Sequence, residues 1–140
     1  MTLPVTPPAG VPMIRIEQLA EQPHFVRLQP LHGVRVDLRY VGSNNFAGRS
    51  LYGSLDCAWL RREAAAGLQA AAQWLHARRP GWTILVLDAL RPQRVQEAIW
   101  KDVEGTPMQH YFAHPGRGSI HSFGMAVDAT LLGADGREAD

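Results

Sequence analysis

The segment Ser119-Ile120-His121-Ser122-Phe123-Gly124-Met125-Ala126-Val127-Asp128 places a histidine and an aspartate on either side of a glycine, among small and apolar residues. Imidazole nitrogens and carboxylate oxygens are both good zinc ligands, and a catalytic zinc ion takes three protein ligands and keeps one position open for water. His121 and Asp128 supply two of the three. The segment therefore predicts a metal site, and its continuation through 129–132 predicts a strand.

Two stretches before this segment have strand patterns. Residues 34–40 alternate strictly, with valine, leucine and tyrosine on one face, which is typical of a half-buried strand. Residues 83–90 form a short apolar run that indicates a buried strand. Polar residues and glycines predict a loop over 42–53, and prolines and glycines predict a second loop over 104–118.

Two other stretches have helical patterns. From about 58 to 79 apolar residues recur at helical spacing, the alanines have high helix propensity, and Pro80-Gly81 ends the helix. Pro92 suits the first turn of a second helix that runs to about Val103. We therefore expect an α+β fold, with a mixed, mainly antiparallel sheet and two helices packed on one side, in a single domain.

Composition and charge narrow the class of function. Of the 140 residues, 46% are hydrophobic and 19% are charged, which is the balance of an ordinary soluble protein. The formal net charge is +1. Neither nucleic acid nor a membrane surface is an expected partner, because both usually require a basic excess. The residue types indicate no oligomeric state.

The N-terminal residues contain several prolines and lack both a basic start and a continuous apolar run. We therefore predict neither a secretory signal nor a transmembrane span, which points to the cytoplasm. Residues 1–30 are expected to form an extended, proline-containing leader, and residues 31–140 to form the domain.

Cys57 is the only cysteine, so no intramolecular disulfide can form. The thiol could be a nucleophile if it lies near a helix start, where the pKa of a thiol falls. The competing interpretation, which is the more common one for a lone cysteine, is a small buried hydrophobe.

Three separated blocks of sequence occur in a fixed order. The first is Val36-Asp37-Leu38-Arg39-Tyr40 with the loop over 45–53, the second is Leu87-Asp88-Ala89-Leu90-Arg91-Pro92-Gln93-Arg94, and the third is the segment over 118–128. Together they resemble the zinc D-alanyl-D-alanine dipeptidases, the family that includes the vancomycin-resistance dipeptidase. The resemblance covers about residues 34–132. It implies hydrolysis of the dipeptide D-Ala-D-Ala with one zinc ion per site, in peptidoglycan precursor turnover.

The resemblance also implies roles for single residues. His121 and Asp128 match two zinc ligands, Arg91 matches the arginine that stabilises the transition state, and Ser119 matches a serine that contacts the dipeptide. The role of Arg91 agrees with its chemistry, because a guanidinium is always charged and presents several donors to an oxyanion. Tyr40 and Asn45 lie in a matching block without an assigned contact.

The sequence departs from the family pattern after Asp128. Family members continue to a Glu-x-x-His element, which provides the general base and the third zinc ligand, whereas Glu138 is the only glutamate after Asp128 here. We therefore interpret the domain as incomplete at its C-terminus, with residues 132–140 ending in a hairpin turn. Phe123 is a smaller departure, since other members often carry a polar or basic residue there.

Several residues have competing interpretations. His121 could be a structural histidine at a strand start, and Arg91 could be a surface residue before a helix. Asp128 lies in an apolar strand, where a buried carboxylate must either bind metal or pair with an arginine. Asp88 is interpreted as an orienting partner for an arginine. The other candidates that the sequence offers for the missing ligand or base are His110, His114, Glu97 and Glu104.

Three functions compete at this point. The first is the zinc dipeptidase, and the second is a related peptidoglycan D,D-carboxypeptidase or endopeptidase. The third is a non-catalytic remnant or binding module, which the missing Glu-x-x-His element favours. A site with two protein ligands and no base is expected to bind zinc weakly and to be nearly inactive.

Overall fold

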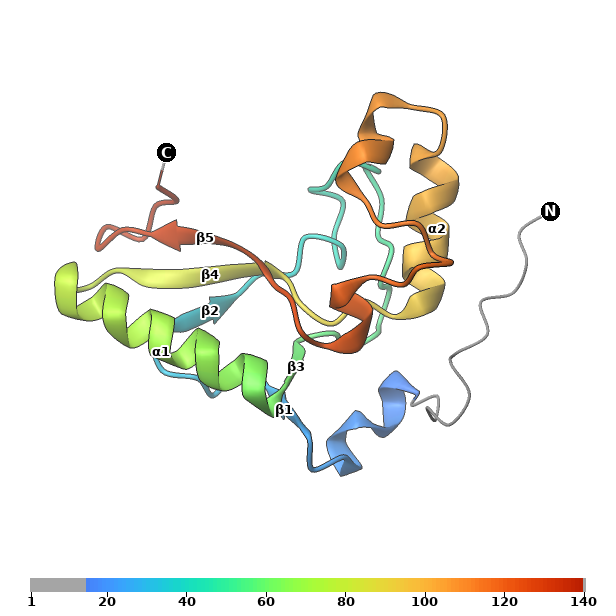
Figure 1. Cartoon of the computed structure of the whole chain (residues 1–140). Helices are drawn as coiled ribbons and strands as arrows, with labels where there is room; N and C mark the ends of the chain where they lie inside the picture. The colour runs from blue at the N-terminus through green and yellow to red at the C-terminus, as the bar shows by residue number, and fades with distance from the viewer. Residues whose placement is uncertain (1–14, 140) are drawn as a thin grey trace.

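The computed structural model describes residues 15–139, in which two small sheets and two α-helices form the scaffold (Figure 1). The three-stranded sheet has the order β2 (Val34–Val36), β4 (Thr83–Asp88), β5 (Asp128–Leu132). The central β4 is parallel to β2 and antiparallel to β5. A second, antiparallel pair joins β1 (Phe25–Arg27) to β3 (Trp59–Arg61). The predicted α+β class, with mixed and mainly antiparallel pairing, is confirmed.

The helix α1 (Arg62–Arg78) lies along the three-stranded sheet (Figure 1). Its buried face, which includes Leu68, Ala72 and Leu75, packs with Ile84 and Val86 of β4 in one apolar cluster. Burying such side chains is the main stabilising contribution to a domain of this size. The cluster therefore holds β4 rigidly, and β4 ends at the candidate site.

The helix α2 (Gln93–Val103) was expected to pack on the same side of the sheet as α1, but it packs elsewhere. Its apolar face packs on the loop that follows β2, in a second cluster that contains Tyr40, Tyr52 and Cys57. Figure 1 shows α2 standing apart from the sheet, beside this loop. The two helices therefore support different parts of the molecule, and the loop over 40–57 is fixed by α2.

The expected helix start at 58 is wrong, because α1 begins at Arg62 and residues 59–61 form β3. Four consecutive residues, 57–60, are buried, whereas an amphipathic helix buries only one face. An extended segment between two layers can bury both of its faces. The predicted strand over 34–40 is also shorter, although the amides of Asp37 and Arg39 still donate to carbonyls of β4.

The expected leader over 1–30 is wrong in its second half. Residues 16–21 form a short 3-10 helix, η1 (Ile16–Glu21), and β1 follows it. Leu19, Phe25 and Leu28 are buried, and burial of three large side chains ties this segment to the domain. The prolines that suggested the leader lie mostly in residues 1–14, outside the described residues.

The predicted loop over 104–118 and the predicted hairpin turn agree with the structure. The loop over 104–118 contains a short 3-10 helix, η2 (Pro107–Tyr111). The glycines after β5 form the predicted hairpin turn, in which the amide of Gly136 donates to the carbonyl of Gly133 and Leu132 pairs with Glu138. Among residues 15–139, no helix is both long enough and apolar enough to cross a bilayer.

Candidate functional site

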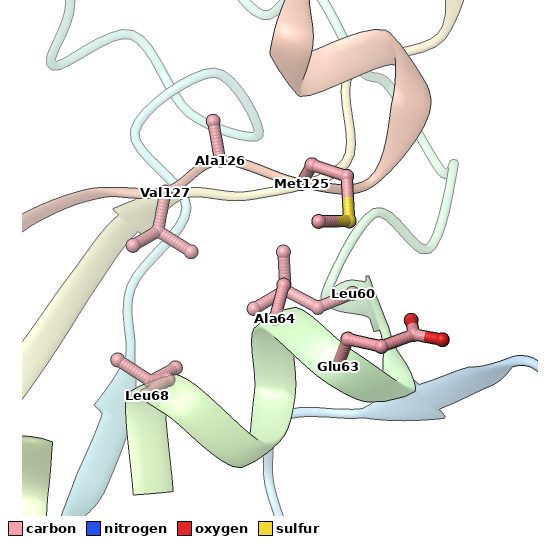
Figure 2. Close-up of a pocket in the computed structure, with 7 residues that line it drawn as sticks. All are labelled: Leu60, Glu63, Ala64, Leu68, Met125, Ala126 and Val127. Atoms are coloured by element: carbon pink, nitrogen blue, oxygen red, sulfur yellow. The ribbon is translucent and has the colours of Figure 1, made fainter. Parts of the chain in front are cut away.

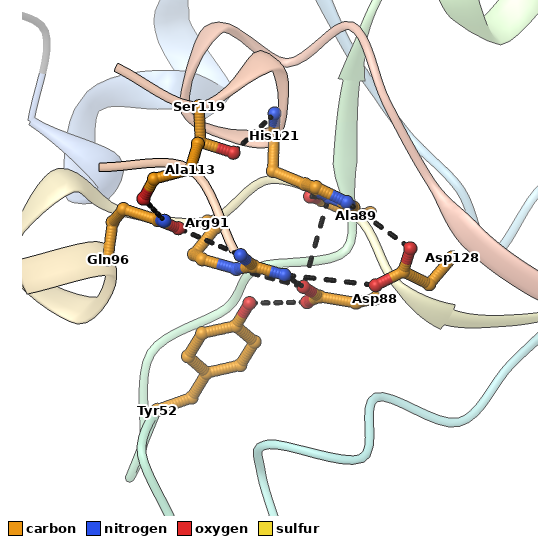
Figure 3. A network of polar contacts seen from close by, with 9 residues as sticks. All are labelled: Tyr52, Asp88, Ala89, Arg91, Gln96, Ala113, Ser119, His121 and Asp128. Atoms are coloured by element: carbon orange, nitrogen blue, oxygen red, sulfur yellow. Dashed lines mark hydrogen bonds and ion pairs between the residues drawn. The ribbon is translucent and has the colours of Figure 1, made fainter. Parts of the chain in front are cut away.

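The register of β4 and β5 brings the main candidate residues together. Asp88, the last residue of β4, is paired in register with Asp128, the first residue of β5. His121 lies in a 3-10 helix, η3 (Ile120–Phe123), just before β5, and Arg91 lies just after β4. The amide of Arg91 donates to the carbonyl of His121 over 3.1 Å, and this bond joins the segment after β4 to η3. Figure 3 shows these side chains converging on one point.

The position of His121 follows from the two ends of η3. At the start, the Ser119 hydroxyl accepts a hydrogen bond from the amide of His121 over 3.2 Å, which is N-capping. At the end, Gly124 has φ +73°, where an added Cβ would lie 2.9 Å from the ring of Phe25. Glycine is therefore required at 124, and the turn that it makes directs the chain into β5.

The imidazole of His121 presents one free nitrogen to the site. Its Nδ1 lies 2.8 Å from the carbonyl oxygen of Ala89. Because a carbonyl only accepts, this contact assigns the proton to Nδ1 in the neutral ring. Nε2 is then unprotonated and faces Asp128 Oδ1 at 3.4 Å. A backbone carbonyl behind a histidine is the usual support for a metal ligand.

The distance between these two atoms fits a zinc ion. Zinc lies about 2.0–2.2 Å from histidine nitrogen and carboxylate oxygen, so two ligands at a tetrahedral angle are roughly 3.3–3.6 Å apart. His121 Nε2 and Asp128 Oδ1 have this separation. With Asp88 they form the one group of three metal-ligating side chains within residues 15–139, all with ligand atoms within 4.8 Å of one another.

Asp88 differs from the other two members of this group because its oxygens are already engaged. Oδ1 accepts from the Tyr52 hydroxyl, and Oδ2 accepts from both Nε and Nη2 of Arg91, at 3.2 and 2.7 Å. Burial raises the pKa of the Asp88 carboxyl, while the charge of Arg91 and these hydrogen bonds oppose the rise. All three donors suit the carboxylate form. Asp88 is therefore placed as an orienting partner of Arg91, as the sequence predicted.

Arg91 is buried, with 4% of its surface exposed, so the interpretation of a surface residue is wrong. Its guanidinium lies over the rings of Tyr40 and Phe112, at 5.5 and 5.8 Å from their centroids. Burial acts to lower its pKa, but the charge and hydrogen bonds of Asp88 outweigh burial and raise it. The arginine is therefore a fixed, permanently charged group, with Nη2 3.8 Å from Asp128 Oδ2.

Asp128 is not buried, contrary to the expectation for an aspartate in an apolar strand. Its side chain is 57% exposed, because β5 is an edge strand and Asp128 is its first residue. When the His121 ring is protonated, its Nε2–H donates to Asp128, and this hydrogen bond lowers the pKa of the Asp128 carboxyl against a smaller opposing effect of burial. The exposed, ionised carboxylate leaves the site open to solvent on this side.

The structure gives different surroundings to the other residues of the matching blocks. Ser119 is 5% exposed, and its hydroxyl caps η3. Tyr40 packs on Arg91, and burial raises the pKa of its phenol to about 12. Asn45 donates to the carbonyls of Arg39, Gly42 and Arg49, so it holds its own loop together.

The alternative ligands and bases lie outside the group. His114 accepts from the amide of Gly116 and packs edge-on against Trp100. Cys57 is fully buried, and burial raises the pKa of its thiol to about 12, which is wrong for a nucleophile at neutral pH. The group of metal-ligating side chains found in residues 15–139 also omits His110, Glu97 and Glu104.

Two residues of the polar network were not singled out from the sequence. Tyr52 donates to Asp88, and Gln96 accepts from Arg91 Nη1 over 2.8 Å. The signal for Gln96 was available, because it occupies the apolar face of α2 next to Val95 and Ile99, and a buried amide requires partners. Which partners it has depends on the tertiary structure.

An apolar groove of ≈ 260 Å³ lies apart from this network, between α1 and residues 125–127 (Figure 2). Glu63 is its one ionisable lining residue. Val127 lines the groove and packs on the α1 cluster, whereas its neighbour Asp128 belongs to the metal-ligating group. Successive residues of an extended chain point to opposite faces, so the segment that leads into β5 separates the groove from the polar site.

Comparison with known proteins identifies the family. A sequence model of the family described as D-ala-D-ala dipeptidase matches residues 20–139, which include every residue of the site. The chain belongs to the D-Ala-D-Ala dipeptidase family. It is also 30% identical over 107 residues to the D-alanyl-D-alanine dipeptidase of Escherichia coli strain K12. That match covers 76% of this chain and 52% of the relative, so the chain spans about half the length of the family member it matches.

Proposed function

We propose that this dipeptidase-family chain provides the zinc-binding and oxyanion-stabilising part of a site that hydrolyses D-Ala-D-Ala in the cytoplasm. The observation that carries the proposal is the 3.4 Å approach of His121 Nε2 to Asp128 Oδ1 beside the buried Arg91. The name of the Escherichia coli relative supports the choice of substrate.

In this proposal His121 Nε2 and Asp128 hold the ion. A bound zinc ion lowers the pKa of a water ligand and polarises a carbonyl. The carbonyl of Ala89 keeps the imidazole in the required tautomer and orientation. Asp88 keeps Arg91 from turning away, because Arg91 donates to it twice.

Arg91 has donors to spare for a substrate. A guanidinium carries five N–H groups. The side-chain hydrogen bonds of Arg91 use three of them: one on Nε, one on Nη1 and one on Nη2. The remaining N–H groups belong to Nη1 and Nη2, and Nη2 lies near Asp128. They are available to a scissile carbonyl oxygen, where loss of one donor typically costs about 10²–10³ in kcat.

We propose that the general base and the third zinc ligand come from a Glu-x-x-His element, as the family resemblance implies. Glu138 does not fill the place of the base, because it pairs with Arg39 and lies opposite Leu132, at the end of β5 away from Asp128. For the 140 residues alone we expect weak zinc binding and no release of D-alanine above background.

The test has two parts. The first is sequencing of the locus and transcript past codon 140, followed by a D-alanine release assay on the product that is encoded. A frame with Glu-x-x-His, and turnover that Arg91→Ala reduces about 10²–10³-fold, would support the proposal. The second is a zinc titration of residues 1–140 with His121→Ala and Asp128→Asn. Zinc binding that both variants leave unchanged would rule out the site.

The same assay separates the dipeptidase from the related peptidoglycan enzymes. A dipeptidase is expected to cleave D-Ala-D-Ala and to refuse N-acylated dipeptides and muropeptides. Cleavage of muropeptides in preference to the free dipeptide would indicate a D,D-carboxypeptidase or endopeptidase instead.

One observation favours the non-catalytic alternative. The third member of the metal-ligating group within residues 15–139 is Asp88, and Tyr52 and Arg91 already occupy its oxygens. A site limited to His121 and Asp128 would bind zinc without completing a catalytic centre. A genuine stop after codon 140, together with zinc binding but no hydrolysis, would make the binding module the better assignment.

A further inference from the structure

Gln96 is the only polar residue among the buried residues of α2. It is fully buried, and its neighbours on that face of α2 are Val95, Ile99 and Trp100. Burying an amide is unfavourable unless both of its ends find hydrogen-bond partners. The side-chain amide of Gln96 therefore requires hydrogen-bond partners from outside the apolar face of α2.

Both ends of the Gln96 amide are satisfied, and in one orientation only. Oε1 accepts from Arg91 Nη1 over 2.8 Å, and Nε2 donates to the carbonyl oxygen of Ala113 over 2.6 Å (Figure 3). The reversed amide would place two donors against each other and two acceptors against each other. The carbonyl of Ala113 thus fixes which end of Gln96 faces the arginine.

Asp88 alone does not fix the plane of the Arg91 guanidinium. Both contacts from Arg91 go to the same oxygen, Oδ2, because Tyr52 occupies Oδ1. Two parallel hydrogen bonds to two oxygens would fix the plane of the guanidinium, whereas two hydrogen bonds to one oxygen allow it to rotate about that oxygen. Gln96 holds Nη1, on the other side of the group, and so removes this freedom.

We propose that Gln96 is a positioning residue that fixes the plane of the Arg91 guanidinium and directs its remaining N–H groups toward the His121–Asp128 pair. The inference rests on the oxyanion role proposed above for Arg91. A neutral amide suits this task better than a second carboxylate, because it accepts a hydrogen bond without neutralising the positive charge that the oxyanion requires.

The chain offers a matched control on the same helix. Gln93 donates from Nε2 to the carbonyl oxygen of Pro115 over 3.0 Å. It therefore fastens α2 to the same loop as Gln96 does, through a similar bond, and its side chain has no hydrogen bond to Arg91. Gln93→Met and Gln96→Met both remove a bond to the loop with little change of shape, and only the second removes the bond to Arg91.

The test uses the ¹⁵N-labelled, zinc-free chain and the guanidinium N–H resonances of Arg91, assigned by their loss in Arg91→Lys. Hydrogen bonding at Nη1 slows both rotation of the group and exchange of its protons with water. We expect the wild type and Gln93→Met to show slowly exchanging Nη1 protons, and Gln96→Met to lose them. Retention of these signals in Gln96→Met would overturn the proposal.

A second variant keeps the test decisive if Gln96→Met fails to fold. Gln96→Glu retains the acceptor for Arg91 and loses the donor to Ala113, so the Nη1 signals should persist. Their loss in folded Gln96→Glu contradicts the proposal. In the D-alanine assay on the encoded product, Gln96→Met should lower kcat about tenfold or more at unchanged KM, and Gln93→Met should change neither. Absence of wild-type turnover would count against the proposed function, while the resonances still decide the role of Gln96.

Discussion

At the scale of single residues, only a few positions restrict strictly which side chain the fold accepts. Gly124 is one, because the turn between η3 and β5 requires a positive φ in a space that Phe25 closes. Cys57 is another, because it is fully buried in the α2 cluster, where burial raises the pKa of its thiol. Each of the two leads to a prediction.

Gly124→Ala is expected to lower the free energy of unfolding by about 2–4 kcal/mol, because strain at positive φ adds to a clash with the Phe25 ring. Gly136→Ala is the matched control, since Gly136 has φ +79° with nothing within 4 Å of an added Cβ. It should cost only about 1–2 kcal/mol. Urea denaturation measures both, and equal losses would contradict the role given to Phe25.

The Cys57 thiol is expected to resist iodoacetamide at pH 7.5 in the folded protein. It is fully buried, and a pKa of about 12 leaves almost no thiolate. The same thiol should react readily in 6 M guanidinium, where burial is lost. Mass spectrometry counts the adducts, and stoichiometric alkylation of the folded chain would restore the nucleophile interpretation.

At the scale of elements, the site is made by the pairing of β4 with β5 and by the short helix that precedes β5. The register opposes Asp88 to Asp128, and a shift of one residue would direct Asp128 to the other face. The helix η3 has only four residues, so its position depends on its cap rather than on its own length.

Ser119→Ala removes the cap of η3 and is expected to cost about 1 kcal/mol of stability. Because the cap holds the amide of His121, we also expect zinc affinity to fall about tenfold. Ser122→Ala, in the same helix, is the control: the Ser122 hydroxyl is buried and has no hydrogen-bond partner among the described residues. Its removal should be neutral or stabilising. Equal effects of the two variants on zinc titrations would contradict the positioning role of the cap.

At the scale of the whole molecule, the site joins two apolar clusters. Ala89 belongs to the cluster between α1 and the sheet, and Val95 belongs to the cluster between α2 and the loop over 40–57. The partly buried Leu38 packs against both. The stability of the whole protein is therefore expected to change with pH as the charged residues of the site titrate.

The zinc-free protein is expected to be more stable near pH 5.5 than near pH 8.5. Burial acts to lower the pKa of His121, but the hydrogen bonds to Asp128 and Ala89 outweigh it and raise the pKa above its ordinary value of 6.5. A raised pKa stabilises the fold below pH 6.5, and the effect is lost as the pH rises through the folded value.

The lowered pKa of Asp128 acts in the other direction. It stabilises the fold above its ordinary value of 3.8, and the effect is lost as the pH falls through the folded value. Melting temperatures at several pH values test both statements, with His121→Ala expected to flatten the upper part of the profile. An unchanged profile in that variant would contradict the pairing. Zinc affinity should instead rise with pH, because the ion requires the neutral imidazole.

Much of this protein could be predicted from its sequence, because the decisive patterns are local. The period of the apolar residues predicts α1, α2 and β4, and the glycines predict the turn after β5. His121 and Asp128 are separated by one short helix and one turn, so their approach to each other is nearly a local property of the chain.

The tertiary structure decided those features that depend on contacts between segments distant in the sequence. The folding of residues 16–27 into the domain, the assignment of 59–61 to a strand and the exposure of Asp128 all depend on which layers cover which elements. The partners of Arg91 also come from separate parts of the chain, since Tyr52 acts through Asp88 and Gln96 is anchored on Ala113. Periodicity reports only that a residue is buried, whereas the identity of its hydrogen-bond partner is set by packing between elements that no local pattern encodes.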